Sequence, residues 1–145
     1  MPDDNTFLQQ FEDATWPLRD WHHSQHIKIA YLYLTRYPFD TAVVKMCAGV
    51  KKYNAAHNIP EDLDQGYHET MTQAWMRLVH FTLCEYGPAE NANAFYEANP
   101  QLSQKKTLRF FYTRDVFMTP KAKAEFVPPD LIPFPQSRKN LQPIK

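Results

Sequence analysis

Residues 20–36, DWHHSQHIKIAYLYLTR, carry the clearest structural signal in this chain. Apolar side chains recur there at the i, i+3, i+4, i+7 spacing of an amphipathic helix, at Ile27, Ala30, Tyr31 and Leu34. Extending this stripe backwards by one turn reaches His23 and His26, so both imidazoles are expected to face the interior. His22 falls at the edge of the same face. The pattern therefore predicts a buried helix that begins with inward-facing histidines.

The same periodicity recurs along the rest of the chain. Helices are expected over residues 5–14, 41–57, 67–86, 89–98 and 103–112, with a short one over 120–126. Prolines lie between these segments, and the three glycines are too few for a turn-rich all-β fold or a glycine-rich phosphate loop. Gly49, inside one expected helix, would permit the close approach of a neighbouring helix or a ligand.

These features predict an all-α protein with a single domain. A helical bundle of about five to six helices is expected over residues 1–127. An extended proline-rich segment, packing on the same domain or leaving it, is expected over residues 128–145.

Composition and charge exclude several classes of protein. The 16 Lys and Arg residues balance 16 Asp and Glu residues, so the basic excess of a nucleic-acid-binding protein is missing. The lysine pairs at residues 51–52 and 105–106 are interpreted as solvent-exposed helix faces. No stretch approaches the roughly 20 apolar residues of a membrane span, and the N-terminal residues do not resemble a signal peptide. We expect a cytoplasmic protein that binds neither nucleic acid nor membranes, with Cys47 and Cys84 buried as free thiols.

Simple helix topology brings the histidines of three segments together. Short connections make neighbouring helices antiparallel, so helices 20–36 and 67–86 should run parallel, with helix 41–57 antiparallel to both. His23 and His26, at the start of the first helix, would then lie near His68, at the start of the last. Asn54 would join them from the end of the middle helix.

This convergence predicts a metal site. Two histidines at i, i+3 and a third from another helix make a three-histidine ligand set with an open position, as in many catalytic sites. The proposed ligands are His23, His26 and His68, and the ion is iron, copper, zinc or nickel, since imidazole suits all four. Four further side chains are candidates to contact the substrate or to move a proton: Asn54, Tyr67, Glu69 and Tyr112. These residues favour an enzyme that acts on a small molecule, by hydrolysis or oxygenation.

Two alternatives remain open. One is a metal-free accessory module that binds a small ligand or a protein, with a histidine-rich pocket and the proline-rich residues 128–135 docked on a partner. The other is a purely structural role, in which the histidines form a polar network at the end of the bundle. His80, away from that end, is expected to be exposed or hydrogen-bonded, and the roles of His22 and His57 stay open. Balanced charge and many aromatic residues are compatible with a homodimer.

Several phrases of the chain resemble a family of small, mostly bacterial proteins without an assigned activity. They are WHHSQHIKIAYLYL (21–34), YN (53–54), GYHETMT (66–72), FYT (111–113) and VPPDL (127–131). The resemblance implies a His-x-x-His pair at His23 and His26, followed by Asn54 and His68 as site residues. It implies no particular reaction.

Overall fold

The computed structural model describes residues 2–137, which form an all-α fold. Its main helices are α1 (Asp4–Glu12), α2 (His23–Arg36), α3 (Phe39–Ala56), α4 (Glu69–Tyr86) and α5 (Ala92–Ala98). Shorter helical elements follow or connect them: η1 (Leu18–Asp20), η2 (Pro100–Ser103), η3 (Lys105–Phe110), α6 (Arg114–Phe117) and α7 (Pro120–Ala124). Within residues 2–137 no strand forms, so the predicted all-α class is confirmed. No helix of these residues has the length and hydropathy of a membrane span.

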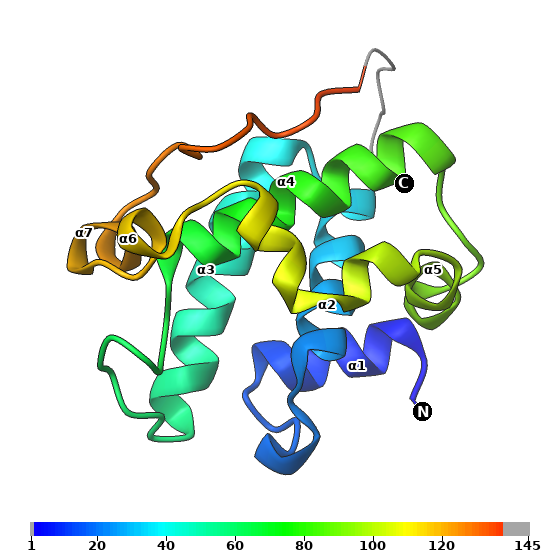
Figure 1. Ribbon diagram of the computed structural model, residues 1–145. Coiled ribbons are helices and arrows are strands. Elements are labelled where there is room, and N and C mark those ends of the chain that lie inside the picture. The colour runs from blue at the N-terminus through cyan, green and yellow to red at the C-terminus, as the bar shows by residue number, and fades with distance from the viewer. Residues whose placement is uncertain (1, 138–145) are drawn as a thin grey trace.

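Helix α2 forms the centre of the molecule. Its residues from Ile27 to Thr35 are all buried, and it contacts α1, α3, α4 and α5. Helix α3 returns antiparallel beside it, as expected, but α4 runs across α2 and α3 instead of parallel to α2 (Figure 1). The antiparallel rule holds for short connections, and the connection between α3 and α4 spans residues 57–68. The expectation of parallel helices was therefore wrong.

Three helix starts lie later than the periodicity predicted, those of α2, α4 and α5, and α5 begins at Ala92 because the Asn91 side chain caps it. Helix α2 begins at His23 and not at residue 20, because Trp16 Nε1 donates to the Asp20 carbonyl (2.9 Å) and holds the 3₁₀ turn η1. Helix α4 begins at Glu69 because the His68 side chain caps it. The segment expected at 103–112 is a 3₁₀ helix, η3, and not an α-helix.

Gly49 marks a close approach between helices α1 and α3. A Cβ atom at this position would lie 2.6 Å from Cε2 of Phe11, a ring that is fully buried. Phe11 stacks on both Trp21 and Tyr53, at ring-centroid distances of 5.2 and 6.0 Å, and these two rings lie 4.7 Å from each other. The close approach predicted from the glycine is confirmed, and the neighbour is a helix.

Gly49→Ala is expected to lower the free energy of unfolding by about 1–2 kcal/mol. Overpacking a full core costs about 1–3 kcal/mol, which exceeds the gain of about 1 kcal/mol in helix propensity. Urea unfolding followed by circular dichroism measures the change. An increase in stability would show that the Phe11 ring moves aside without cost.

The proline-rich segment packs on the helical body over residues 128–137. Leu131 N donates to the Phe111 carbonyl (3.0 Å), and the Asp130 carboxylate accepts from Thr113 N and Oγ1 (2.9 and 2.8 Å). The Phe134 ring lies 4.8 Å from that of Phe111. This part of the predicted extended segment thus lies along its own domain, and residues 138–145 of the predicted tail lie outside the described residues.

Candidate functional site

A cavity of about 290 Å³ lies between the start of α2, the end of α3 and the start of α4. Trp21, Trp75, Met46, Val50 and Met76 form its apolar walls. Its polar lining comes from His22, His23, His26, Asn54, His68 and Lys105. The residues that topology was expected to bring together from three segments therefore do share one cavity, although α4 crosses α2.

His26 is neutral at physiological pH and keeps one nitrogen unprotonated. Its Nδ1 lies 3.1 Å from the His22 carbonyl oxygen, which only accepts, so Nδ1 carries the proton and Nε2 a lone pair. Burial lowers the pKa of His26 to about 4. The ring packs on Trp21 at a centroid distance of 4.1 Å. His26 thus offers the cavity a hydrogen-bond acceptor in a fixed orientation.

His23 is held in the complementary tautomer. Its Nε2 donates to the Leu102 carbonyl (2.8 Å), which leaves the lone pair on Nδ1. Burial lowers the pKa of His23, and its ring contacts Trp75 at 4.7 Å. This imidazole is therefore also neutral, and residue 102, far away in the sequence, fixes its orientation.

His68 uses both ring nitrogens on the backbone. Nδ1 accepts from Met71 N (3.0 Å), which caps α4, and Nε2 donates to the Phe117 carbonyl (3.0 Å). The ring stacks on Phe117 at a centroid distance of 4.5 Å. His68 contributes a wall to the cavity, and neither of its nitrogens is available to a ligand while these bonds persist.

Asn54 lines the cavity from the end of α3, as the sequence analysis predicted. As a whole residue it is only 6% exposed, and its side-chain amide forms no hydrogen bond with another described residue. The amide atoms keep some solvent-accessible surface, because within residues 2–137 His80 Nδ1 is the one fully buried side-chain atom without a partner. An amide of this kind pairs with the water or the ligand that occupies the cavity. Tyr53 beside it points elsewhere and donates to the Trp16 carbonyl (2.6 Å). The Asn54 amide therefore offers the cavity two donors and an acceptor.

Glu69 and Tyr67, predicted as catalytic residues, pair with each other. The Glu69 carboxylate accepts from Tyr67 Oη (2.7 Å), Gln73 Nε2 (2.5 Å) and Cys47 Sγ (3.6 Å). Partial burial raises the pKa of Glu69, but these hydrogen bonds outweigh that effect and lower it. Glu69 does not line the cavity, and Tyr67 lines it with its hydroxyl group already engaged.

Two other residues that the sequence analysis considered for the site, Tyr112 and His57, lie apart from the cavity. Tyr112 lines a neighbouring hollow, and its hydroxyl donates to the Val127 carbonyl (2.6 Å). His57 is not part of the lining; its Nε2 pairs with the Ala14 carbonyl (2.9 Å). Among the four predicted catalytic residues, Asn54 is the one that presents an unpaired polar group to the cavity.

The donor set does not match the predicted three-histidine metal site as folded. No group of three or more His, Cys, Asp or Glu residues within residues 2–137 is placed to hold one ion. His23 and His26 each keep one unprotonated nitrogen, whereas both nitrogens of His68 are engaged with the backbone. Metal binding by this set therefore stays a prediction from the sequence.

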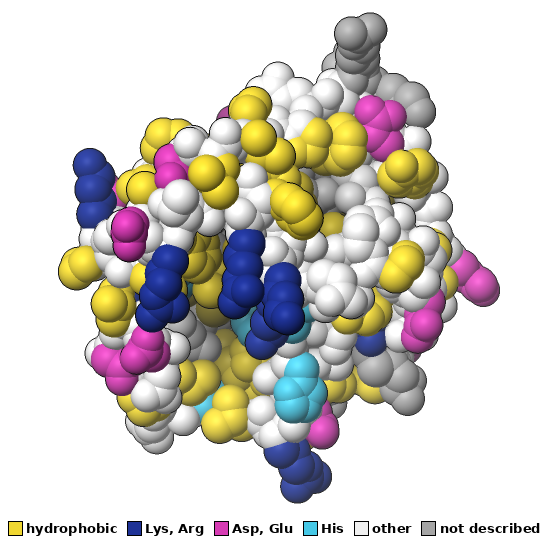
Figure 2. Space-filling model, viewed as in Figure 1, with side chains coloured by type: hydrophobic (Ala, Val, Ile, Leu, Met, Phe, Trp, Pro, Cys, Tyr) yellow, Lys and Arg dark blue, Asp and Glu magenta, His cyan; other side chains and the backbone are white. Residues whose placement is uncertain are grey.

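A second hollow of about 530 Å³ adjoins the cavity. The two share His23, Met71, Trp75 and Lys105. Figure 2 shows Lys and Arg side chains gathered near the centre of this face, around a depression with hydrophobic and histidine side chains. The sequence analysis predicted an α-helix over residues 103–112 but no wall of a hollow, and this segment forms 3₁₀ turns instead. Lys105 is solvent-exposed, as interpreted from the sequence, and it also lines both spaces.

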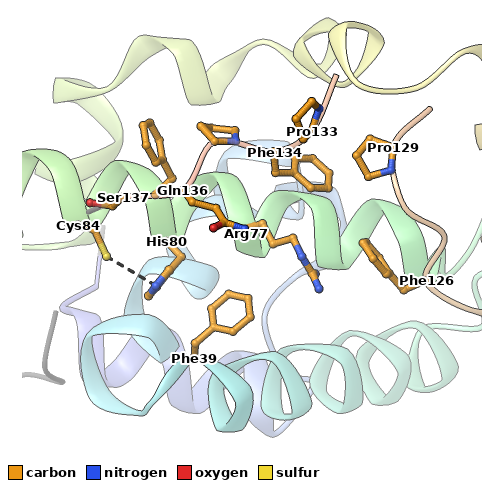
Figure 3. Close-up of a pocket in the computed structure, with 12 residues that line it drawn as sticks. Phe39, Arg77, His80, Cys84, Phe126, Pro129, Pro133, Phe134, Gln136 and Ser137 are labelled. Carbon is orange, nitrogen blue, oxygen red and sulfur yellow. Dashed lines mark hydrogen bonds between the residues drawn. The ribbon is translucent and has the colours of Figure 1, made fainter. Parts of the chain in front are cut away.

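A third cavity, of about 520 Å³, lies under the proline-rich segment (Figure 3). His80 and Cys84 line it from α4, and His80 Nε2 lies 3.6 Å from Cys84 Sγ. His80 Nδ1 is buried and has no partner among the described residues. The expectation that His80 is exposed or fully hydrogen-bonded was therefore wrong. Both cysteines are free and buried, as predicted.

Comparisons with protein-family models, with curated proteins and with solved structures found no match to this chain. The resemblance of its sequence phrases to small bacterial proteins therefore stays a prediction.

Proposed function

We propose that this protein binds a small molecule in the cavity between α2, α3 and α4. The carrying observation is the Asn54 amide, which forms no hydrogen bond with another residue of 2–137 and lines the same cavity as two neutral imidazoles. Its amide atoms are accessible from the cavity, so they can pair with water or with a polar group of a ligand. A bound ligand supplies that partner, so the cavity has the character of a binding site.

The lining indicates which polar groups the ligand carries. His26 Nε2 and His23 Nδ1 are acceptors, so they pair with hydroxyl, amine or amide donors. Asn54 pairs with either a donor or an acceptor. The indole rings of Trp21 and Trp75 contribute apolar walls, as is usual for small-molecule sites.

Asn54→Leu separates a binding role from a structural one. We expect the free energy of unfolding to stay unchanged or to rise by up to about 1 kcal/mol, because the amide forms no hydrogen bond with the protein and its removal leaves no partner unpaired. Asn99→Leu is the matched control. Asn99 is 7% exposed, and its amide donates to the Phe95 carbonyl (2.8 Å), so its replacement should cost about 1–3 kcal/mol.

Urea unfolding of both variants measures this contrast. A loss of stability in Asn54→Leu as large as that in Asn99→Leu would give Asn54 a structural role and contradict the proposal.

A metalloenzyme that uses His23, His26 and His68 is the second candidate. The observation in its favour is the lone pair that remains on each of His23 and His26, an i, i+3 pair in one cavity. Elemental mass spectrometry of untagged protein from metal-supplemented cells decides between the two. Near-stoichiometric iron, copper, zinc or nickel that disappears in His26→Ala would replace the metal-free proposal.

A further inference from the structure

The hollow beside the histidine cavity combines an apolar floor with a basic rim. Trp75, Leu108, Phe117, Met118 and Leu131 contribute apolar surface to it. Lys105, Arg109 and Arg114 contribute positive charge, and its lining includes no carboxylate. Met71 and Leu131 are 39% and 51% exposed, which leaves apolar surface open at this site.

The three cations of this rim have no acidic partner. Among the described residues, none of their side chains forms an ion pair or a hydrogen bond. Asp130, close in space to Thr113, has its carboxylate engaged by that residue's N and Oγ1 atoms. The chain as a whole has no excess of basic residues. Three unpaired cations around one hollow are therefore a local feature.

Lys105 joins the rim to the histidine cavity. It lines both spaces, together with His23. Burial is the main cause of the lowered pKa values of His23 and His26, and their backbone hydrogen bonds oppose it. The positive charge of Lys105 lowers both pKa values further, which places Lys105 near both imidazoles. One molecule that occupies both spaces would thus meet neutral hydrogen-bonding groups at one end and positive charge at the other.

We propose that the ligand is an amphipathic anion, with an acidic group at Lys105, Arg109 and Arg114 and an apolar body in the hollow. This inference rests on the proposed function and names the chemical class of its ligand. Carboxylate and phosphate groups share the required chemistry, since both accept charge-assisted hydrogen bonds from guanidinium and ammonium groups. A small ligand fits better than a nucleic acid, because the three cations line a single hollow and the chain as a whole has no basic excess.

Calorimetry and tryptophan fluorescence with three probes test this inference: decanoate, decyl phosphate and decanol. The three share an apolar chain and differ in charge. We expect at least one anion to bind ten-fold or more tightly than decanol, and its affinity to fall with salt. The stronger anion identifies the acidic group as carboxylate or phosphate.

Charge variants locate the acidic group. The triple variant Lys105→Gln, Arg109→Gln, Arg114→Gln should lower anion affinity at least 30-fold. Lys106→Gln is the matched control, because Lys106 is exposed on the same 3₁₀ helix and lines neither space. Its affinity should stay within two-fold of that of the wild type.

The outcomes separate this inference from the proposed function. Equal affinity for decanol and the anions, the absence of anion binding, or an unchanged affinity in the triple variant would each overturn the amphipathic anion. The proposed function fails separately, by the contrast between Asn54→Leu and Asn99→Leu, which needs no probe.

Discussion

Lowering the pH from 7 to 4 should reduce the free energy of unfolding by on the order of 3 kcal/mol through His26 alone. Burial holds the pKa of this imidazole at about 4 in the folded protein, against 6.5 in the unfolded chain. Between these values the unfolded chain binds a proton that the folded protein does not, so stability falls as the pH falls. Each pH unit across this window costs about 1.4 kcal/mol. The contribution is complete above pH 6.5.

Neighbouring groups act in the same direction. Burial also lowers the pKa of His23 and His68, so both lose stability on acidification. The lowered pKa values of Glu69 and Asp130 add to this loss only near and below the ordinary range of carboxyl groups. The interval from pH 6.5 to about 5 therefore reports mainly on the histidines.

Urea unfolding at a series of pH values measures this dependence. The variant His26→Gln keeps a polar side chain without a titrating group. The number of protons that it takes up on unfolding between pH 6.5 and 4 should therefore be smaller by up to one than in the wild type. Nuclear magnetic resonance of the His26 Cε1 proton gives its pKa directly. Titration of His26 near 6.5 in the folded protein would contradict the buried, neutral imidazole and its role as an acceptor at physiological pH.

Helical periodicity predicted the parts of the site that lie on long helices. His23 and His26 were expected to face inwards from the stripe that continues through Ile27 and Ala30, and both line the cavity. Asn54 was placed there by the same reasoning on α3. The fold class followed from these patterns too, because the main helices α1, α3, α4 and α5 all pack against α2.

The sequence did not predict the directions of single side chains at the start of α4. Glu69 follows His68 by one residue, which turns it about 100° around the helix. It therefore contacts Cys47 and Gln73 and does not enter the cavity. The pairing of His68 with Phe117 depends on chain folding over 49 residues, which no local pattern encodes.

The wall made by residues 102–118 was also not predicted correctly. An α-helix was expected over residues 103–112, whereas the wall is built from 3₁₀ turns and one short helix. Leu102 acts through its backbone carbonyl, which every residue has. In the sequence, the three basic residues of the rim are separated and form no recognisable cluster. The turns of the folded chain bring Lys105, Arg109 and Arg114 to one hollow.

His68→Ala should destabilise the protein by about 2–3 kcal/mol. The loss of the cap on Met71 N costs about 1 kcal/mol, and the unpaired Phe117 carbonyl adds about 1–2 kcal/mol. His68→Asn should recover about 1 kcal/mol, because asparagine is among the best N-cap residues but does not reach Phe117. His22→Ala, at an exposed position with no side-chain cap bond, should change stability by less than about 0.5 kcal/mol.

This series also distinguishes a cap from a metal ligand at His68. A ligand would make the alanine and asparagine variants equally unstable, and a chelator would reduce the wild type to their level. If His68 acts as a cap, stability decreases in the order wild type, His68→Asn, His68→Ala, and a chelator leaves that order unchanged. Urea unfolding of the four proteins with and without a chelator therefore shows whether His68 stabilises α4 directly, as both of its hydrogen bonds indicate.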